Sequence, residues 1–267
     1  MPKEIDNQII NKANDAVAKA GVELLRKEPF YAHVLSGLSR IVTEEIPTMA
    51  VSYKNDGFCL WINPIFTIKE LSDKERIAVL KHELLHLVFK HLFRGRGNDR
   101  ELENIAADLV VNQYVSPWPL PQGALLLTSF PDLNLLPEQT FEWYYEKLRK
   151  LRSSNAAEKH QKSKSTLDSI ETNKNSRGND DFWGAEKKDG QNTNEKVLDV
   201  AIKKLIGQAL QKSGTKNIGS LPLEIQRELT RLNEKPKVSW KRILRIFSNS
   251  CGKTKLESTR RKESTRF

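Results

Sequence analysis

The segment KHELLHLVFKH, residues 81–91, holds three of the five histidines of the chain. His82, Glu83 and His86 form the pattern HExxH, in which the two histidines are four positions apart. On a helix this spacing places both imidazoles on nearly the same face, where they can share one metal ion. Zinc binds neutral imidazole nitrogen and lowers the pKa of a bound water to about 7. Glu83 can then take the proton of that water as it attacks a carbonyl carbon.

A catalytic zinc site needs a third protein ligand. His91 is the nearest candidate in the sequence. On an unbroken helix, however, its side chain lies about 180° around the axis from His82, and residues 87–90 are expected to continue the helix. We therefore predict that His91 supports the site from outside the metal's ligands or has a structural role.

The next segment, ELENIAADLVVNQYV at residues 101–115, offers a better third ligand. Asn104, Asp108 and Asn112 are spaced by four residues and share one face of a helix whose other positions are largely apolar. A carboxylate in an apolar helix is costly unless it is paired or binds a metal. Asp108 is therefore the predicted third ligand. Asn112, one turn further, is expected to accept a hydrogen bond from the outer nitrogen of a liganding histidine.

Alternatives to this assignment stay open. Asp108 can instead pair with an arginine such as Arg94 or Arg96, in which case Glu103 is the substitute ligand. The side chain that would stabilise the oxyanion is also unassigned among three candidates, each of which is equally typical of a packing residue: His33, Tyr53 and Tyr114.

Local patterns predict the elements that hold these residues. Ser72, three residues before Glu75, forms a capping-box pattern at the start of one long helix that ends at Gly95 and Gly97. A second helix is predicted for residues 99–115. The turn sequence KNDG between two apolar runs predicts a β-hairpin over residues 48–63. Apolar periodicity predicts the remaining helices at residues 6–27, 30–42, 137–151, 195–212, 223–232 and 239–247.

Composition divides the chain into four parts. Residues 1–151 form the main domain, and residues 152–194, rich in Ser, Asn, Lys, Asp and Gly, form a flexible polar linker. Residues 195–250 are predicted to be a helical appendage, and residues 251–267 a basic tail. Between Lys235 and Phe267 eleven Lys and Arg face two Glu, a net charge of +9. Such a tail can bind nucleic acid or an acidic partner, although a merely solvated tail is the commoner case.

Other features of the sequence predict where in the cell the protein is found. No apolar run is long enough to span a bilayer, and the N-terminus has no signal-peptide core. We therefore expect a cytoplasmic protein without membrane contact. Cys59 and Cys251 lack the spacing of a thiolate metal site, so both are expected to be free thiols.

The chain resembles a known family in several quoted segments. The segments that carry the resemblance are HELLHLVFKHLFR and NIAADLVVNQ, with AVSYKNDGFCLWINPIF before them and DDFWG and KVSWKRILRIF after them. They are similar to the metallopeptidase domain at the N-terminus of bacterial and phage proteins that carry a von Willebrand factor A-like domain. The resemblance implies a zincin-like fold with His82, Glu83, His86 and Asp108 at a Zn²⁺ site. It also implies a MoxR-type AAA+ ATPase as a partner. The chain ends at TRRKESTRF, about where the second domain would begin, so that domain is expected to be absent.

Together these features predict an α+β, mainly helical protein with a zincin-like metallopeptidase domain, a small β-hairpin or sheet, an active-site helix and a C-terminal helical appendage. The leading functional hypothesis is a zinc-dependent metallopeptidase that hydrolyses a peptide or protein substrate through a metal-bound water activated by Glu83. The hairpin would bind the substrate by strand addition. The second hypothesis is a catalytically silent metal-binding or adaptor module. The third is a nucleic-acid-associated protein that binds through its basic tail.

Overall fold

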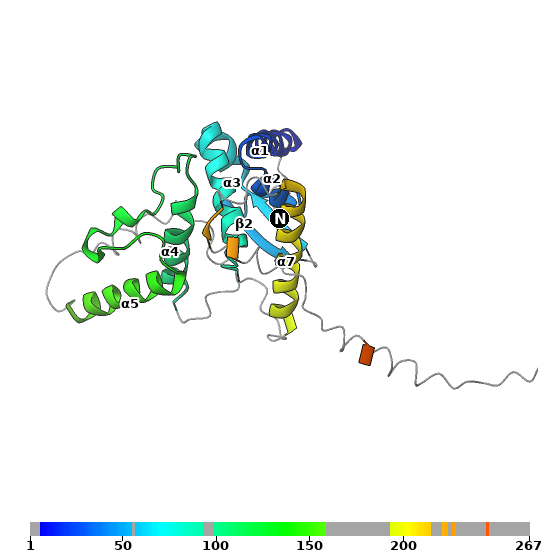
Figure 1. Cartoon of the computed structure of the whole chain (residues 1–267). Helices are drawn as coiled ribbons and strands as arrows, with labels where there is room; N and C mark the ends of the chain where they lie inside the picture. Colours follow the sequence, from blue (N-terminus) through cyan, green and yellow to red (C-terminus); the bar gives the residue numbers. More distant parts are fainter. Residues whose placement is uncertain are drawn as a thin grey trace, which may run out of the picture. The chain divides into compact units, whose positions relative to one another are not determined.

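The computed structural model describes residues 6–54, 57–92, 99–158, 193–214, 221–223, 226–227 and 244–245. The chain divides into two compact units, Met1–Arg227 and Glu228–Phe267, and every element described below belongs to the first. This unit has mainly helices and one small β-sheet, which is an α+β architecture (Figure 1). Among the described residues, no helix has both the length and the apolar character needed to cross a membrane.

The sheet has three strands in the order β1-β3-β2. Strands β2 (Met49–Lys54) and β3 (Gly57–Ile62) are antiparallel and confirm the predicted hairpin. Strand β1 (Ser39–Val42) pairs with β3 in parallel, with Ser39 opposite Cys59. The helix predicted for residues 30–42 is therefore wrong in its second half, because α2 (Pro29–Leu35) ends early and the residues after it complete the ladder of β3. Consequently β2 is an edge strand.

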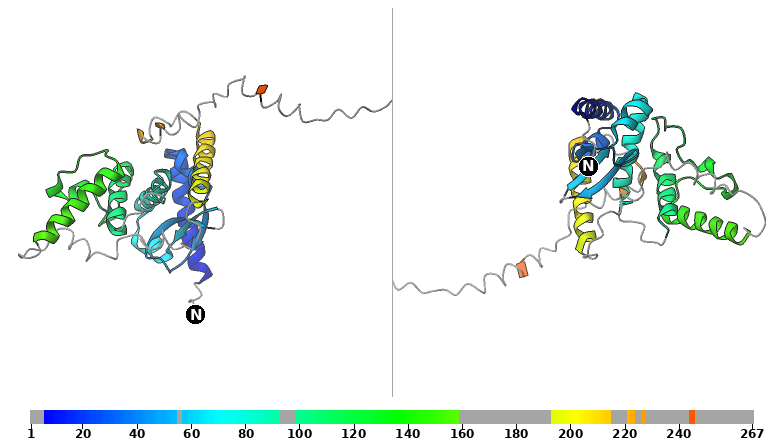
Figure 2. Two further views of the ribbon diagram at one scale, coloured as in Figure 1. Left: turned by 90° about the horizontal axis from the view of Figure 1, so that it is seen from below. Right: turned by 180° about the vertical axis from the view of Figure 1, so that it is seen from behind.

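Two N-terminal helices cover the core. Helix α1 (Asn7–Lys27) begins at Asp6, whose carboxylate accepts a hydrogen bond from the backbone N–H of Gln8. Its buried face packs against α2 and against α3 (Asp73–Val88), which follows the sheet in the chain (Figure 2). The apolar periodicity that predicted α1 locates the helix, but it marks only part of the buried face. Val22 and Leu25 are exposed, and the buried positions are Ala13, Val17, Ala20 and Leu24.

Helix α3 starts where the sequence predicts. The Ser72 hydroxyl accepts from the backbone N–H of Glu75, and the Glu75 carboxylate accepts from the backbone N–H of Ser72, which completes a capping box. The helix ends at Val88, however, and not near residues 95–97. Lys90 adopts a positive φ of 60°, and the backbone N–H of His91 donates to the carbonyl of His86 at 2.9 Å. This is a Schellman turn, which reverses the chain just after the HExxH segment.

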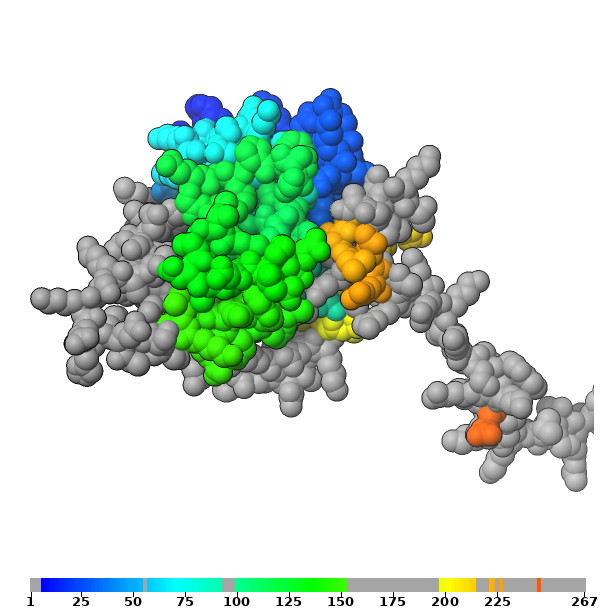
Figure 3. All heavy atoms as spheres, turned by 60° about the vertical axis from the view of Figure 1, so that its left-hand side comes forward, coloured from blue at the N-terminus to red at the C-terminus, as the bar shows by residue number. Residues whose placement is uncertain are grey.

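The next elements form a helical pair beside α3. Helix α4 (Arg100–Val111) continues into a 3₁₀ turn at Asn112–Tyr114, and α5 (Phe141–Glu158) packs against α4 (Figure 3). Both helices were predicted, although α5 begins later than residue 137. The loop between them contains the short 3₁₀ turns Leu127–Ser129 and Pro131–Leu133.

Helix α7 (Thr193–Ser213) corresponds to the helix predicted at residues 195–212 and packs against α2 and α3. Its buried positions include Ile202, Ile206 and Ala209. Lys90, in the turn after α3, donates to Asp199 of α7 at 2.8 Å. Residues 159–192 of the predicted linker and most of the predicted helices and basic tail beyond residue 214 lie outside the described residues. The four-part domain division therefore stays a prediction.

Candidate metal centre

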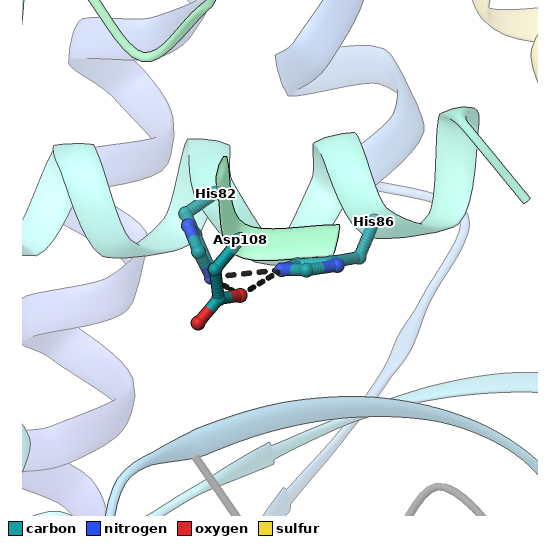
Figure 4. Close-up of side chains that lie close together, drawn as sticks. All are labelled: His82, His86 and Asp108. Atoms are coloured by element: carbon teal, nitrogen blue, oxygen red, sulfur yellow. Dashed lines mark hydrogen bonds and ion pairs between the residues drawn. The ribbon is translucent and has the colours of Figure 1, made fainter. Parts of the chain in front are cut away.

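Three side chains predicted as metal ligands converge between α3 and α4 (Figure 4). The Nε2 atoms of His82 and His86 lie 2.8 Å apart. Oδ1 of Asp108 lies 3.1 Å from Nε2 of His86 and 3.5 Å from Nε2 of His82. Each of the three residues offers one ligand atom, and these atoms all lie within 4.8 Å of one another, which is close enough to hold one metal ion.

Two of the three distances between these atoms are close to those expected around a zinc ion. Zinc lies about 2.0–2.1 Å from imidazole nitrogen, so two ligand atoms at a tetrahedral angle are roughly 3.3 Å apart. The two distances to Asp108, 3.1 Å and 3.5 Å, bracket this value. The 2.8 Å between the two histidine nitrogens is shorter, so the rings would separate by about half an ångström around zinc. Two imidazoles with one carboxylate are also a ligand set found in catalytic zinc sites.

When no metal is present, the charges of the cluster favour one added proton on the pair of histidines. Burial lowers the pKa of His82, but the hydrogen bond and negative charge of Asp108 outweigh this effect and raise it to about 9. Burial and the nearby charge of His82 lower the pKa of His86 to about 4. Burial acts to raise the pKa of Asp108, yet hydrogen bonds to the two histidines hold it well below its usual range. At neutral pH, His82 is therefore protonated and His86 is neutral.

Glu83 is buried next to the cluster, and its carboxylate accepts a hydrogen bond from the backbone of Val51 on strand β2. Burial raises the pKa of Glu83 to about 7. The positive charge of His82 and the hydrogen bond from the backbone N–H of Val51 lower this pKa, whereas the negative charge of Asp108 raises it. Its Oε2 atom is buried and has no hydrogen-bond partner among the described residues. A buried carboxyl group with a pKa near neutrality can accept a proton and return it, which is the behaviour of a general base.

Asn112 lies where the sequence predicts, against the outer nitrogen of His82. Its Oδ1 is 2.8 Å from Nδ1 of His82, and its Nδ2 donates to the carbonyl of Leu125 at 2.8 Å. The second bond orients the amide so that its oxygen faces the histidine. His82 then donates from Nδ1 and directs Nε2 toward the cluster.

His91 lies beside His86, which corrects the expectation that it points away from the pair. Their Nδ1 atoms are 3.2 Å apart. The turn after α3 makes this contact possible, because the helix ends at Val88 and does not continue to His91. The imidazole of His91 stacks on the ring of Phe89, with centroids 5.6 Å apart, and lies 5.7 Å from the ring of Phe141.

The remaining candidates are not among the three clustered ligands or lie outside the described residues. Glu103 is buried on α4 and is not part of the cluster, and Arg94 and Arg96 lie outside the described residues. Of the oxyanion candidates, Tyr53 packs against Phe58, Tyr114 packs against Phe89, and His33 lies on α2. Cys59 is a buried free thiol, and Cys251 lies outside the described residues.

Sequence reasoning did not find Val51 and Leu125, which contact Glu83 and Asn112. Each acts through a backbone atom. A backbone N–H or carbonyl is present at nearly every position of a chain, so no residue type could have identified these two.

Comparison with known proteins adds to this geometry. A protein of Thermotoga maritima, described as an uncharacterized protein, is 24% identical over 256 residues. The match covers 88% of this chain and 59% of the relative, so the chain spans about three-fifths of the length of that protein. No solved structure matches the chain. Residues 12–266 match the family described as "Putative metallopeptidase domain", and the chain therefore belongs to this family.

Proposed function

We propose that this chain is a zinc-dependent peptidase of zincin-like fold that hydrolyses peptide bonds in peptide or protein substrates. The observation that carries the proposal is the convergence of two imidazoles and one carboxylate beside a buried glutamate. His82, His86 and Asp108 place their ligand atoms within 4.8 Å of one another. Glu83 lies next to them, and its Oε2 has no partner in the part of the chain that the structure describes. Membership of the metallopeptidase family supports the same reading.

Each residue has a distinct role in the proposed reaction. His82, His86 and Asp108 would hold the zinc ion, which supplies a Lewis acid that polarises the scissile carbonyl and acidifies a water molecule. Oε2 of Glu83 takes the proton as the water attacks the carbonyl carbon. The pKa of Glu83, about 7, allows its carboxyl group to pass this proton to the leaving nitrogen. Asn112 holds the His82 ring in the required tautomer.

The substrate would bind along the outer edge of β2 at residues 52–54, since Met49, Ala50 and Val51 are buried. This strand is at the edge of the sheet, so its outer backbone groups can pair with an extended peptide. The backbone N–H of Val51 on β2 acts on the carboxylate of Glu83. A peptide paired with β2 would therefore lie next to the general base.

The proposal is tested by measuring zinc content and peptide cleavage on the same preparation. The wild-type chain should contain one zinc ion per molecule and cleave members of a peptide library. Glu83→Gln should retain the zinc and lose activity by roughly 10²–10⁴-fold, the usual contribution of a general base. Glu70→Gln, at an exposed position on the preceding turn, is the matched control and should keep full activity.

Removal of the metal separates catalysis from a structural role. If the site is catalytic, a chelator should abolish cleavage while the protein stays folded by circular dichroism. A fold that melts on chelation, with no cleavage by the zinc-loaded protein, would support a silent metal-binding or adaptor module instead. Failure of the pure, folded chain to bind zinc would refute the proposal.

A further inference from the structure

A buried ion pair includes Lys81, the residue next to His82 in helix α3. Nζ of Lys81 donates to Oε1 of Glu28 at 2.5 Å and to the carbonyl of Ser116 at 2.9 Å. It also lies 5.1 Å from the centre of the Tyr31 ring. Oε2 of Glu28 accepts from Nε1 of Trp118 at 2.6 Å. The side chains of Lys81 and Glu28 are only 3% and 15% exposed, so solvent screens this pair weakly.

Stability alone is a weak reason for such a pair. Moving two charges out of water costs several kcal/mol per ion, and replacing a buried pair by apolar residues is often neutral or stabilising. What the pair does provide is a fixed geometry. It joins three separate parts of the chain: the junction of α1 and α2 at Glu28, helix α3 at Lys81, and the segment after α4 at Ser116 and Trp118.

This geometry bears on the metal centre through two adjacent residues of α3. Lys81 binds the carbonyl of Ser116 at 2.9 Å, and its neighbour His82 lies 2.8 Å from Oδ1 of Asn112. Asn112 and Ser116 are four residues apart in the segment that follows α4. Two consecutive residues of one helix therefore hold two points of the same short segment. Displacing Ser116 would move the amide that orients His82.

We propose that Lys81, Glu28 and Trp118 form a positioning network that sets the orientation of the His82 ring through Asn112. The network touches neither the ligand atoms nor the reacting groups. Its part in catalysis rests on the proposed peptidase function, whereas its effect on the His82 ring exists in the metal-free protein as well. Trp118 is the outermost member, because it holds Oε2 of Glu28 while Oε1 binds Lys81.

Two conservative variants probe the network: the first keeps the ion pair of Lys81 and Glu28, and the second leaves the Lys81 ammonium bonded only to neutral oxygens. Trp118→Phe removes one N–H donor and keeps an aromatic ring. Glu28→Gln removes the charge and keeps an oxygen and a similar shape. Trp61→Phe is the matched control, because it removes an indole N–H bond of 2.8 Å to Ser52 on the sheet. Trp61 lies on strand β3, and the loss of stability that comes from removing an indole N–H bond should appear in this control as well.

The first measurement uses the metal-free protein. The ¹⁵N and ¹H signals of the His82 ring report its protonation state and its hydrogen bond to Asn112. Trp118→Phe and Glu28→Gln should shift or broaden these signals, and Trp61→Phe should leave them at the wild-type positions. If all three variants show the wild-type ring signals, the network has only a structural role and the inference is wrong.

The second measurement uses the zinc-loaded or cobalt-loaded protein. Loss of a direct outer partner of a ligand costs about 10–100-fold in metal affinity, so for a network one step further away we expect a loss of roughly threefold to tenfold. The cobalt absorption bands should also shift in the two network variants and not in Trp61→Phe. Wild-type affinity and bands in both variants would contradict the proposal. If the wild-type chain binds no metal, the peptidase proposal fails and the ring signals alone decide the inference.

Discussion

Nδ1 of His86 lies 3.2 Å from Nδ1 of His91, although His91 follows the helix that carries His86. The contact depends on the turn at Lys90, where a positive φ of 60° brings the chain back over the last turn of α3. Neutral His86 can donate from Nδ1 to His91, which leaves its Nε2 as an acceptor directed at the cluster. His91 thus supports the second histidine as Asn112 supports the first.

Replacing His91 by phenylalanine should weaken zinc binding with little effect on packing. The new ring can keep the stacking on Phe89 and the contact with Phe141, but it cannot bind Nδ1 of His86. We expect an affinity loss of about 10–100-fold in competition with a chromophoric chelator. His33→Phe on α2 is the control and should bind zinc as the wild type does. Equal affinity of the two variants would contradict the supporting role of His91.

The third ligand can be identified by comparing two acidic residues of α4. Asp108→Asn should lower zinc affinity by more than the 10–100-fold typical of an outer partner, because it weakens a direct ligand. Glu103→Gln should leave the affinity unchanged, since Glu103 lies outside the cluster. Cobalt absorption spectra provide the measurement, and Asp108→Asn should change the bands. The reverse pattern would make Glu103 the ligand.

Zinc binding should release about one proton at neutral pH. In the metal-free protein the pKa of His82 is about 9, whereas zinc binds only the neutral imidazole. Zinc must therefore displace a proton from His82 at any pH below about 9. Affinity should rise about tenfold per pH unit between roughly 7 and 9, and level off above that range. Calorimetry in two buffers of different ionisation enthalpy measures the release. Affinity independent of pH over this interval would contradict the prediction.

The packing of α7 can be tested at Gly37. A Cβ atom at this position would lie 2.3 Å from Cδ1 of Leu205, so any larger residue displaces the helix or its leucine. Gly37→Val should lower the free energy of unfolding by about 1–3 kcal/mol, the usual cost of overpacking. Leu205→Ala in the same chain should recover part of this loss by making room.

A second glycine provides the control for this measurement. Gly207 lies within α7, and apart from its chain neighbours and the backbone of its own helix no described atom lies within 4 Å of an added Cβ. Gly207→Ala should raise the free energy of unfolding by about 0.5–1 kcal/mol, because alanine is the better helix former. Urea unfolding curves measure both variants. Equal stability of Gly37→Val and the wild type would show that α7 does not pack closely at Gly37.

The sequence by itself determined the parts of the site that depend on local periodicity. HExxH placed His82 and His86 on one face because a helix repeats every 3.6 residues. The four-residue spacing of Asn104, Asp108 and Asn112 predicted which face of α4 would meet that pair. The Ser72 and Glu75 pattern located the start of α3, and the KNDG turn located the hairpin. Each of these signals is contained in a few neighbouring residues.

Only the tertiary structure decided the features that join distant parts of the chain. Residues 39–42 form β1 because β3 offers them a free edge, not because of a pattern of their own. The turn at Lys90 uses a residue other than glycine, and Lys90 is held by Asp199, 109 positions away. Lys81 meets Glu28 across 53 positions. Such contacts form when elements pack, and no local spacing of residue types encodes them, because a side chain or backbone group can pair with any partner that folding brings near.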